Sequence, residues 1–309
     1  MDSVTAWSQY WSEDNRQSNG GCLPGSLTQL QEQQKSIWTS FAQQMPRKGR
    51  VLDLACGDGD VIRTMLKARS DLKAVGVDSA EAVANFPKGA RLRPKTNMEK
   101  LPFGAQSFNG ITSQFGFEYG DSDRIIKEIA RVLKVGGLYS LIVHVENSAI
   151  VESNLSRKND LDDLINGKKI ISMAQNYIRN GSPMGPIVPP VILNIVQEAE
   201  QTFGRNSVRW QFSAAVAQTL QLAANTPIEG TLHQLKALQL HGLGELKRIS
   251  ELSNAGLSKK GVEDLKEVFD SNELTVSNLS LMKLDNGKAF AWSMQGRMEK
   301  SSGTSPNVR

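Results

Sequence analysis

The chain has 309 residues, of which 39% are hydrophobic, and its formal net charge is +4. This length is enough for one large domain or two small ones with a buried core, and the composition is that of a globular protein. Because the charge is nearly balanced and forms no basic stripe, we expect no nucleic-acid partner. Two cysteines are too few for a disulfide framework or a zinc site, so no metal is expected.

The first 44 residues contain no apolar signal core, and no later run approaches the roughly 20 apolar residues of a membrane span. We therefore expect a cytoplasmic protein without a membrane span. Trp7, Tyr10 and Trp11 precede a helix predicted over 27–44. We interpret residues 1–44 as a helical cap whose aromatic rings fold over a ligand pocket. A helix that its aromatics pin to the core is the alternative.

Residues 51–60, VLDLACGDGD, predict a buried parallel strand, a tight turn at Gly57 and Gly59, and the start of a helix. A second short strand, AVGVDSA, ends at Asp78, where a carboxylate can accept hydrogen bonds from two ribose hydroxyls. Together they indicate a nucleoside-binding α/β sheet. Acids on both sides of the turn, Asp53 and Asp60, would repel a pyrophosphate but suit a ligand with a cationic amine and a sulfonium.

This pattern resembles the class I S-adenosylmethionine-dependent methyltransferases. Among them it is most similar to the type 11 methyltransferases that act on small molecules. Their turn reads acid-x-Gly-x-Gly-x-Gly, and Ala55 takes the place of its first glycine. The resemblance implies S-adenosylmethionine as the cofactor. It also implies a set of cofactor contacts in and beside the two strand ends: Asp53, Ala55, Gly57, Gly59, Asp78 and Ser79.

Residues 96–120 resemble the adenine-side loop and fourth strand of that family. Asn97 replaces the usual aspartate and keeps an acceptor oxygen for the adenine amino group, with Met98 packing beside it. Asn109 replaces a later aspartate. In the family, the residue at Gln114 approaches the methionyl part of the cofactor, and Trp11 is a further cofactor contact on our interpretation of the N-terminal cap.

The next segment, residues 124–146, predicts a helix, a Gly-Gly turn and a fifth strand over 138–145. It resembles the family's Arg-Val-Leu-Lys-Pro-Gly-Gly signature, with Val135 in place of proline. The resemblance covers about residues 45–147, and it indicates the fold and cofactor far more sharply than the substrate.

Residues 148–270 lack strand alternation and predict a helical insertion. Its expected helices are separated by turns such as NTPIEG and HGLG, and they centre on residues 192–203, 216–220, 232–240, 243–252 and 262–269. Because the insertion leaves the carboxyl end of strand five, we favour a substrate lid, with Gly181–Pro190 as its entry hinge. A peripheral bundle that forms a homodimer is the alternative.

The sheet resumes at residues 271–299, where Asp285-Asn286-Gly287 predicts a hairpin turn. Residues 300–309 are expected to be a disordered tail. The predicted fold is therefore a doubly wound, mostly parallel, seven-stranded α/β sheet with an antiparallel last hairpin and a large helical insertion. The cofactor-binding domain comprises residues 45–147 and 271–299.

Methyl transfer mainly needs alignment and exclusion of water, and a base is needed only when the acceptor is protonated at neutral pH. Glu118 and Tyr119 follow strand four, and His144 closes strand five, so these three are the candidate catalytic residues. A hydrogen-bonded structural histidine and an exposed helix-entry carboxylate are the alternatives. His233 and His241 have no partner at metal-ligand spacing.

The leading interpretation is methyl transfer to O, N or S of a small molecule. Methylation of a macromolecule, RNA or protein, would favour an open basic groove, whereas the insertion's acids and bases nearly balance. A protein that only binds a nucleoside or assembles with a partner is the third hypothesis. The intact Asp53, Gly57, Gly59 and Asp78 argue against it.

Overall fold

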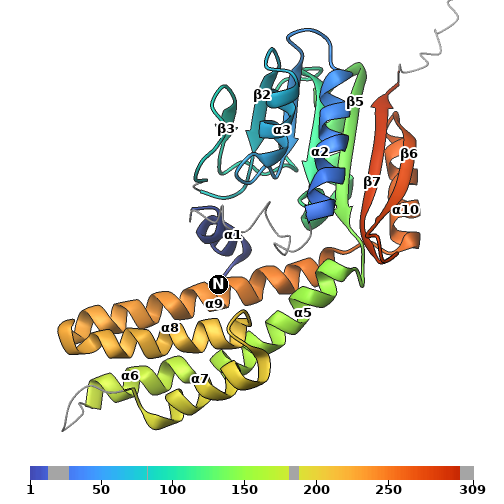
Figure 1. Cartoon of the computed structure of the whole chain (residues 1–309). Coiled ribbons are helices and arrows are strands. Elements are labelled where there is room, and N and C mark those ends of the chain that lie inside the picture. Colours follow the sequence, from blue (N-terminus) through green and yellow to red (C-terminus); the bar gives the residue numbers. More distant parts are fainter. Residues whose placement is uncertain (13–27, 82, 181–187, 300–309) are drawn as a thin grey trace, which may run out of the picture. The chain divides into compact units, whose positions relative to one another are not determined.

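The computed structural model describes residues 1–12, 28–81, 83–180 and 188–299 (Figure 1). The chain forms two compact units, one of Met1–Gln9 with Glu152–Ser250 and one of Tyr10–Val151 with Glu251–Arg309. The expected tail and residues 181–187 of the expected hinge lie outside the described residues. The two units are considered separately below.

The larger unit contains a seven-stranded sheet with the order β3-β2-β1-β4-β5-β7-β6 (Figure 1). Its strands are β1 (Arg50–Leu54), β2 (Lys73–Val77), β3 (Arg91–Arg93), β4 (Phe108–Gln114), β5 (Leu133–His144), β6 (Leu274–Lys283) and β7 (Ala289–Met298). The first five strands run parallel, and β7 runs antiparallel to both β5 and β6. The predicted fold class is confirmed.

The last hairpin turns where the sequence predicts. Leu284 donates its N–H to the carbonyl of Lys288 at 2.9 Å, and Gly287 has a φ of 79°, which glycine adopts without strain. Strand β5 differs from its prediction, because it begins at Leu133 and not at residue 138. Leu133 is buried and pairs with Phe108, so the two glycines lie within the strand and do not precede it.

Helices cover both faces of the sheet. On one face α2 (Thr28–Gln43) packs beside α3 (Asp60–Ala68). On the other face α4 (Ser122–Val132) and α10 (Lys259–Ser271) contact each other and share the main core. The helix α1 covers Ser3–Ser12.

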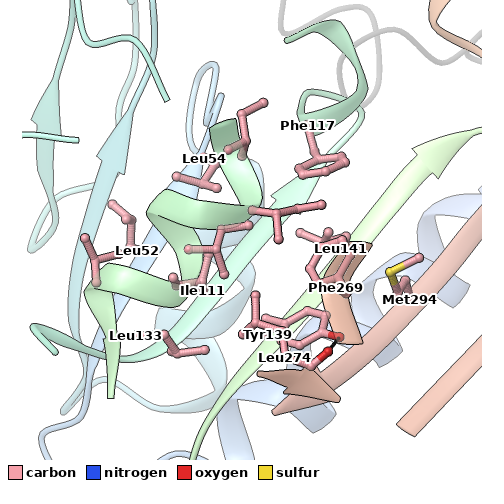
Figure 2. Close-up of a cluster of buried hydrophobic side chains, with 14 of the residues drawn as sticks. Leu52, Leu54, Ile111, Phe117, Leu133, Tyr139, Leu141, Phe269, Leu274 and Met294 are labelled. Carbon is pink, nitrogen blue, oxygen red and sulfur yellow. Dashed lines mark hydrogen bonds between the residues drawn. The ribbon is translucent and has the colours of Figure 1, made fainter. Parts of the chain in front are cut away.

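Figure 2 shows why α10 belongs to the sheet. Phe269 is fully buried, and its ring stacks on that of Tyr139 with 5.0 Å between centroids, among Leu141 and Leu274 from the strands. The predicted insertion runs to residue 270, whereas in the structure this helix packs in the core of the sheet. Its apolar spacing resembles that of the preceding helices, so the pattern alone did not tell which core it joins.

The helical unit has its own apolar core. It is built mainly by α5 (Ala149–Asp162), α6 (Ile170–Asn180), α7 (Pro190–Phe203), α8 (Val208–Leu222) and most of α9 (Ile228–Ala255). The prediction of a turn at HGLG is wrong, because α9 continues through it. A Cβ on Gly242 would lie 2.5 Å from Ile165 Cδ1 and 3.0 Å from the Phe212 ring, so this glycine permits close packing. Within the described part of the chain, no helix is long and apolar enough to span a bilayer.

The turns that follow β1 and β4 touch at the carboxyl edge of the sheet. A Cβ built on Gly116 would lie 2.4 Å from the Cβ of Ala55, closer than two carbon atoms can approach. Ala55 itself has a φ of 49°, in the left-handed region that glycine adopts most readily. A glycine at position 116 is therefore what allows an alanine at position 55.

We predict that Gly116→Ala destabilises the protein by about 1–3 kcal/mol through overpacking. Ala55→Gly combined with Gly116→Ala should recover most of this loss, because the clashing methyl is removed. Gly104→Ala is the control, since its nearest contact would be Ser107 Oγ at 3.8 Å. Urea unfolding of the four proteins measures the effect. An equal loss in the single and double variants would show that the two turns do not touch.

Candidate functional site

The turn after β1 has the backbone shape that the sequence predicts. Gly57 and Gly59 have φ values of 48° and 80°, and Gly59 caps the N-terminus of α3. The N–H of Cys56 is donated to the carbonyl of Val77 at 3.0 Å, so the turn stays close to the end of β2. Three consecutive features of the motif, strand, glycine turn and helix, are thus in place.

The carboxylate of Asp78 holds this turn. Its Oδ2 accepts the N–H of Gly57 at 2.8 Å, and its Oδ1 accepts the N–H of Ala80 at 2.9 Å. Asp78 is buried, and burial raises the pKa of its carboxyl group, an effect that these N–H donors partly offset. Each carboxylate oxygen keeps a further lone pair for a ligand.

Asp53 lies on the neighbouring strand and is also buried. Thr112 on β4 donates its hydroxyl to Asp53 Oδ1 at 2.8 Å, while Asp53 Oδ2 is buried without a partner in the described structure. Burial raises the pKa of Asp53 to about 8. Thr112 was not predicted from the sequence as a site residue. It lies directly opposite Asp53 on the adjacent parallel strand, and this position was the available signal.

The remaining acids of the turn are partly neutralised. Arg63 on α3 donates to Asp60 Oδ1 at 3.0 Å and lies 3.5 Å from Asp58 Oδ2. It also donates to the carbonyl of Asp58 at 3.0 Å. From the sequence, Asp60 was expected to be an unpaired negative charge beside the ligand. In the structure Asp60 forms an ion pair with Arg63, so it is not an unpaired charge that faces a ligand.

Two aromatic rings lie against the glycines. A Cβ on Gly57 would lie 2.5 Å from the Trp11 ring, and the carbonyl of Trp11 accepts the N–H of Ala84 at 2.8 Å. A Cβ on Gly59 or on Gly76 would lie within 3 Å of the Phe86 ring. Trp11 was predicted to fold over the ligand pocket, and its contact with a cofactor stays a prediction. Phe86 was not predicted, because no sequence pattern in the loop after β2 indicates it.

The adenine-side loop reaches the end of β2 through its backbone. Thr96 donates its N–H to the carbonyl of Asp78 at 2.9 Å, which places the next residues, Asn97 and Met98, beside that acid along the chain. Asn97 is exposed, and its Oδ1 accepts the N–H of Glu99 at 2.8 Å. The acceptor that was expected for adenine thus already serves a local turn, with one lone pair to spare. Ser79 is exposed beside Asp78.

Gln114 ends β4 and is held by α2. Trp38 Nε1 donates to Gln114 Oε1 at 2.6 Å, and Trp38 is itself buried. The amide oxygen is therefore oriented by the protein, which leaves the amide nitrogen as the donor for another group. Trp38 lies in the helix predicted over 27–44, but its contact with Gln114 was not predicted from the sequence.

The three candidate catalytic residues come together. Glu118 Oε1 lies 2.6 Å from His144 Nδ1, and the Tyr119 ring stands edge-on to the imidazole with 6.0 Å between centroids. The alternative of an exposed carboxylate is wrong, because the Glu118 side chain is only 1% exposed. No group of three or more metal-ligating side chains occurs among the described residues.

The residues at the turn fit a nucleoside that also carries an ammonium group. Asp53 offers a carboxylate oxygen that has no partner among the described residues, and Asp78 offers further lone pairs at the end of β2. Such an arrangement binds hydroxyls and a cation.

The comparisons with known proteins agree with this geometry. Residues 51–137 match the family model described as a methyltransferase domain. Over 93 residues the chain is 37% identical to a demethylmenaquinone methyltransferase of Thermotoga maritima, which covers 28% of this chain and 40% of the relative. Over 120 residues it is 37% identical to a ubiquinone/menaquinone biosynthesis C-methyltransferase of Xanthomonas oryzae, covering 33% and 45%. The chain thus spans less than half the length of these two relatives.

Among solved structures, a geranyl diphosphate C-methyltransferase of Streptomyces coelicolor in complex with S-adenosyl-L-homocysteine aligns with a TM-score of 0.48 and 13% identity. The alignment covers 96% of this chain and 99% of that one. The strand order, the turn after β1 and the family match over 51–137 together identify the domain. Residues 51–137 are therefore a methyltransferase domain, in agreement with the resemblance to the class I S-adenosylmethionine-dependent methyltransferases.

Proposed function

We propose that this protein transfers the methyl group of S-adenosylmethionine to a small-molecule acceptor. The observation that carries the proposal is the buried, unpartnered Oδ2 of Asp53 beside the glycine turn. An unsatisfied buried carboxylate oxygen costs stability, and a ligand ammonium would satisfy it. When bound, the cofactor supplies a methyl group on a sulfonium whose leaving thioether is neutral.

The residues of this chain would hold the cofactor from three sides. Asp78 accepts the ribose hydroxyls, with Ser79 beside it, and Asn97 and Met98 take the adenine. The Gln114 amide, which Trp38 orients, and the ring of Trp11 would contact the amino-acid end of the cofactor and exclude water.

A small-molecule acceptor is favoured over a macromolecule by two observations. Both relatives described above act in quinone biosynthesis by their names, and the chain's charge is nearly balanced. We also keep the prediction that the helical unit closes over the acceptor. It rests on topology, because the chain enters that unit from the carboxyl end of β5.

We predict that Asp78→Ala weakens binding of S-adenosylhomocysteine by about 10- to 150-fold, equivalent to about 1.5–3 kcal/mol, through loss of a charged acceptor. Asp71→Ala is the matched control. Asp71 also accepts a backbone N–H, from Lys48 at 2.7 Å, but lies before β2. Both variants should lose stability, and only Asp78→Ala should lose affinity in a calorimetric titration. Binding of NAD in place of the nucleoside thioether would refute the cofactor assignment.

The raised pKa of Asp53 predicts how binding depends on pH. Below pH 8 the carboxyl group of the free protein is mostly protonated, whereas a ligand ammonium favours the ionised form. Binding then releases a proton, so the affinity for S-adenosylhomocysteine should rise up to about tenfold per unit between pH 6 and 7. Asp53→Asn should bind more weakly and without this slope. A flat profile for the unaltered protein would exclude Asp53 as the partner of the ammonium.

The acceptor class can be tested directly. The purified protein, S-adenosylmethionine and either the dialysable or the retained fraction of a cell extract are mixed, and S-adenosylhomocysteine is measured. We expect turnover with the dialysable fraction, because the acceptor is small. Turnover with the retained fraction alone would show a macromolecular acceptor. Binding without turnover in either fraction would support a protein that only binds the nucleoside.

A further inference from the structure

A glutamate and a histidine form a buried hydrogen-bonded pair beyond the cofactor turn. Glu118, on the short 3-10 helix Phe117–Tyr119, accepts the backbone N–H of His144 at 2.8 Å and lies 2.6 Å from its Nδ1. The two side chains are 1% and 0% exposed. Because both contacts use the same carboxylate oxygen, the imidazole is held in one orientation at the end of β5.

The outer atom of each side chain has no partner. His144 Nε2 and Glu118 Oε2 are buried and make no hydrogen bond to the described residues. An unsatisfied buried polar atom costs about 1–3 kcal/mol, so a pair that served only the fold would be expected to satisfy these atoms. Two such atoms on neighbouring side chains therefore indicate a ligand group that completes their hydrogen bonds.

The carboxylate also decides which imidazole nitrogen carries the proton. An ionised Glu118 can only accept hydrogen bonds, so neutral His144 holds its proton on Nδ1 and keeps a lone pair on Nε2. A lone pair on a buried, oriented nitrogen can take a proton from a bound molecule. The same carboxylate stabilises the imidazolium that results.

The surroundings of the pair are aromatic. The Phe115 ring lies against the imidazole with 4.3 Å between centroids and an angle of 33°, and Tyr119 stands edge-on. Phe115 has a φ of 55°, a strained value for this residue type that functional sites often retain. Apolar walls disfavour an ammonium group as the acceptor and favour a neutral hydroxyl on a flat ring.

The pair lies on the same face and edge of the sheet as the cofactor residues. Side chains alternate along a strand, so on β4 Thr112 and Gln114 share one face, and Thr112 is bonded to Asp53 on that face. Gln114 pairs in register with Ile142, two residues before His144 on β5. The imidazole therefore lies on the sheet face that carries Asp53, two residues closer to the carboxyl end of β5 than Ile142, the partner of Gln114.

We propose that His144 is the catalytic base of the methyl transfer and that Glu118 is its positioning residue. This rests on the proposed function, and it narrows the acceptor to a phenol- or enol-type hydroxyl, methylated on its oxygen or on the adjacent carbon. His144 Nε2 takes the hydroxyl proton, and the electron pair stays on the acceptor. In methylation on oxygen, that pair would form the new bond to the methyl carbon while the carbon–sulfur pair returns to sulfur. In methylation on the adjacent carbon, the oxygen pair would instead form a C=O bond and the C=C pair would form the bond to the methyl carbon; the proton of the methylated carbon would then pass to the oxygen to restore the hydroxyl. The proton then leaves from His144 to water.

The tautomer of His144 can be measured without knowing the acceptor. In the full chain labelled with ¹⁵N-histidine, the His144 signals are assigned by their loss in His144→Gln. We expect a protonated Nδ1 and a bare Nε2 in the neutral ring. With saturating S-adenosylhomocysteine, 2-naphthol should shift the Nε2 signal, whereas 2-methoxynaphthalene, which has no hydroxyl, should not. A proton on Nε2 overturns the base, and no response to 2-naphthol overturns the acceptor class.

Turnover with the active extract fraction tests the chemistry. His144→Gln should lower kcat by about 10²- to 10⁴-fold without changing the affinity for S-adenosylhomocysteine, and added imidazole should restore part of the rate of His144→Gly. Glu118→Gln, which keeps the shape but not the charge, should also lower kcat. His233→Gln on α9 is the control and should match the unaltered protein. If the unaltered protein does not bind S-adenosylhomocysteine, the proposed function itself is refuted. A normal kcat in His144→Gln would refute only the pair.

Discussion

The geometry of the cofactor site depends on one buried carboxylate. Asp78 accepts the N–H groups of Gly57 and Ala80, and so ties the turn after β1 to the end of β2. Its own backbone carbonyl then receives the N–H of Thr96, which brings in the adenine-side loop. Three loops that are far apart in sequence therefore meet at a single residue. Because a side chain without two acceptor oxygens could not satisfy both donors in this way, position 78 serves the fold as well as the proposed ligand.

Burial of such a carboxyl group costs stability, but it also favours the binding of a cation. Asp53 has an isolated oxygen and a pKa raised to about 8, so a positive ligand relieves both its desolvation and its missing partner. Arg63, by contrast, pairs with Asp58 and Asp60 at the start of α3. Asp58 and Asp60 thus have an ion-pair partner, whereas Asp53 Oδ2 has no hydrogen-bond partner among the described residues.

The features that could be predicted from sequence are those set by local backbone rules. The glycine turn after β1 and the hairpin at Asp285-Asn286-Gly287 both follow from the conformations that glycine allows. The contacts that could not be predicted are long-range. Whether Glu118 reaches His144 depends on the path of the chain after β4, and no spacing rule gives that path. Likewise, Gly242 would end a helix by local rules, but tertiary packing keeps it inside α9.

The departures from the family pattern make physical sense when each is matched with its contact. Ala55 takes a left-handed conformation in place of glycine, and the missing side chain at Gly116 gives its methyl group room. Asn109 accepts the N–H of Arg50 at 3.1 Å, at the strand ends opposite the site, where the charge of an aspartate has no ligand to meet. Asn97 closes a turn with Glu99 and keeps a lone pair. A motif residue can therefore be substituted where the new side chain, or a neighbouring residue, still meets the steric or hydrogen-bonding requirement of that position. Asp78 cannot be replaced so easily, because it must satisfy two backbone donors as well as the ligand.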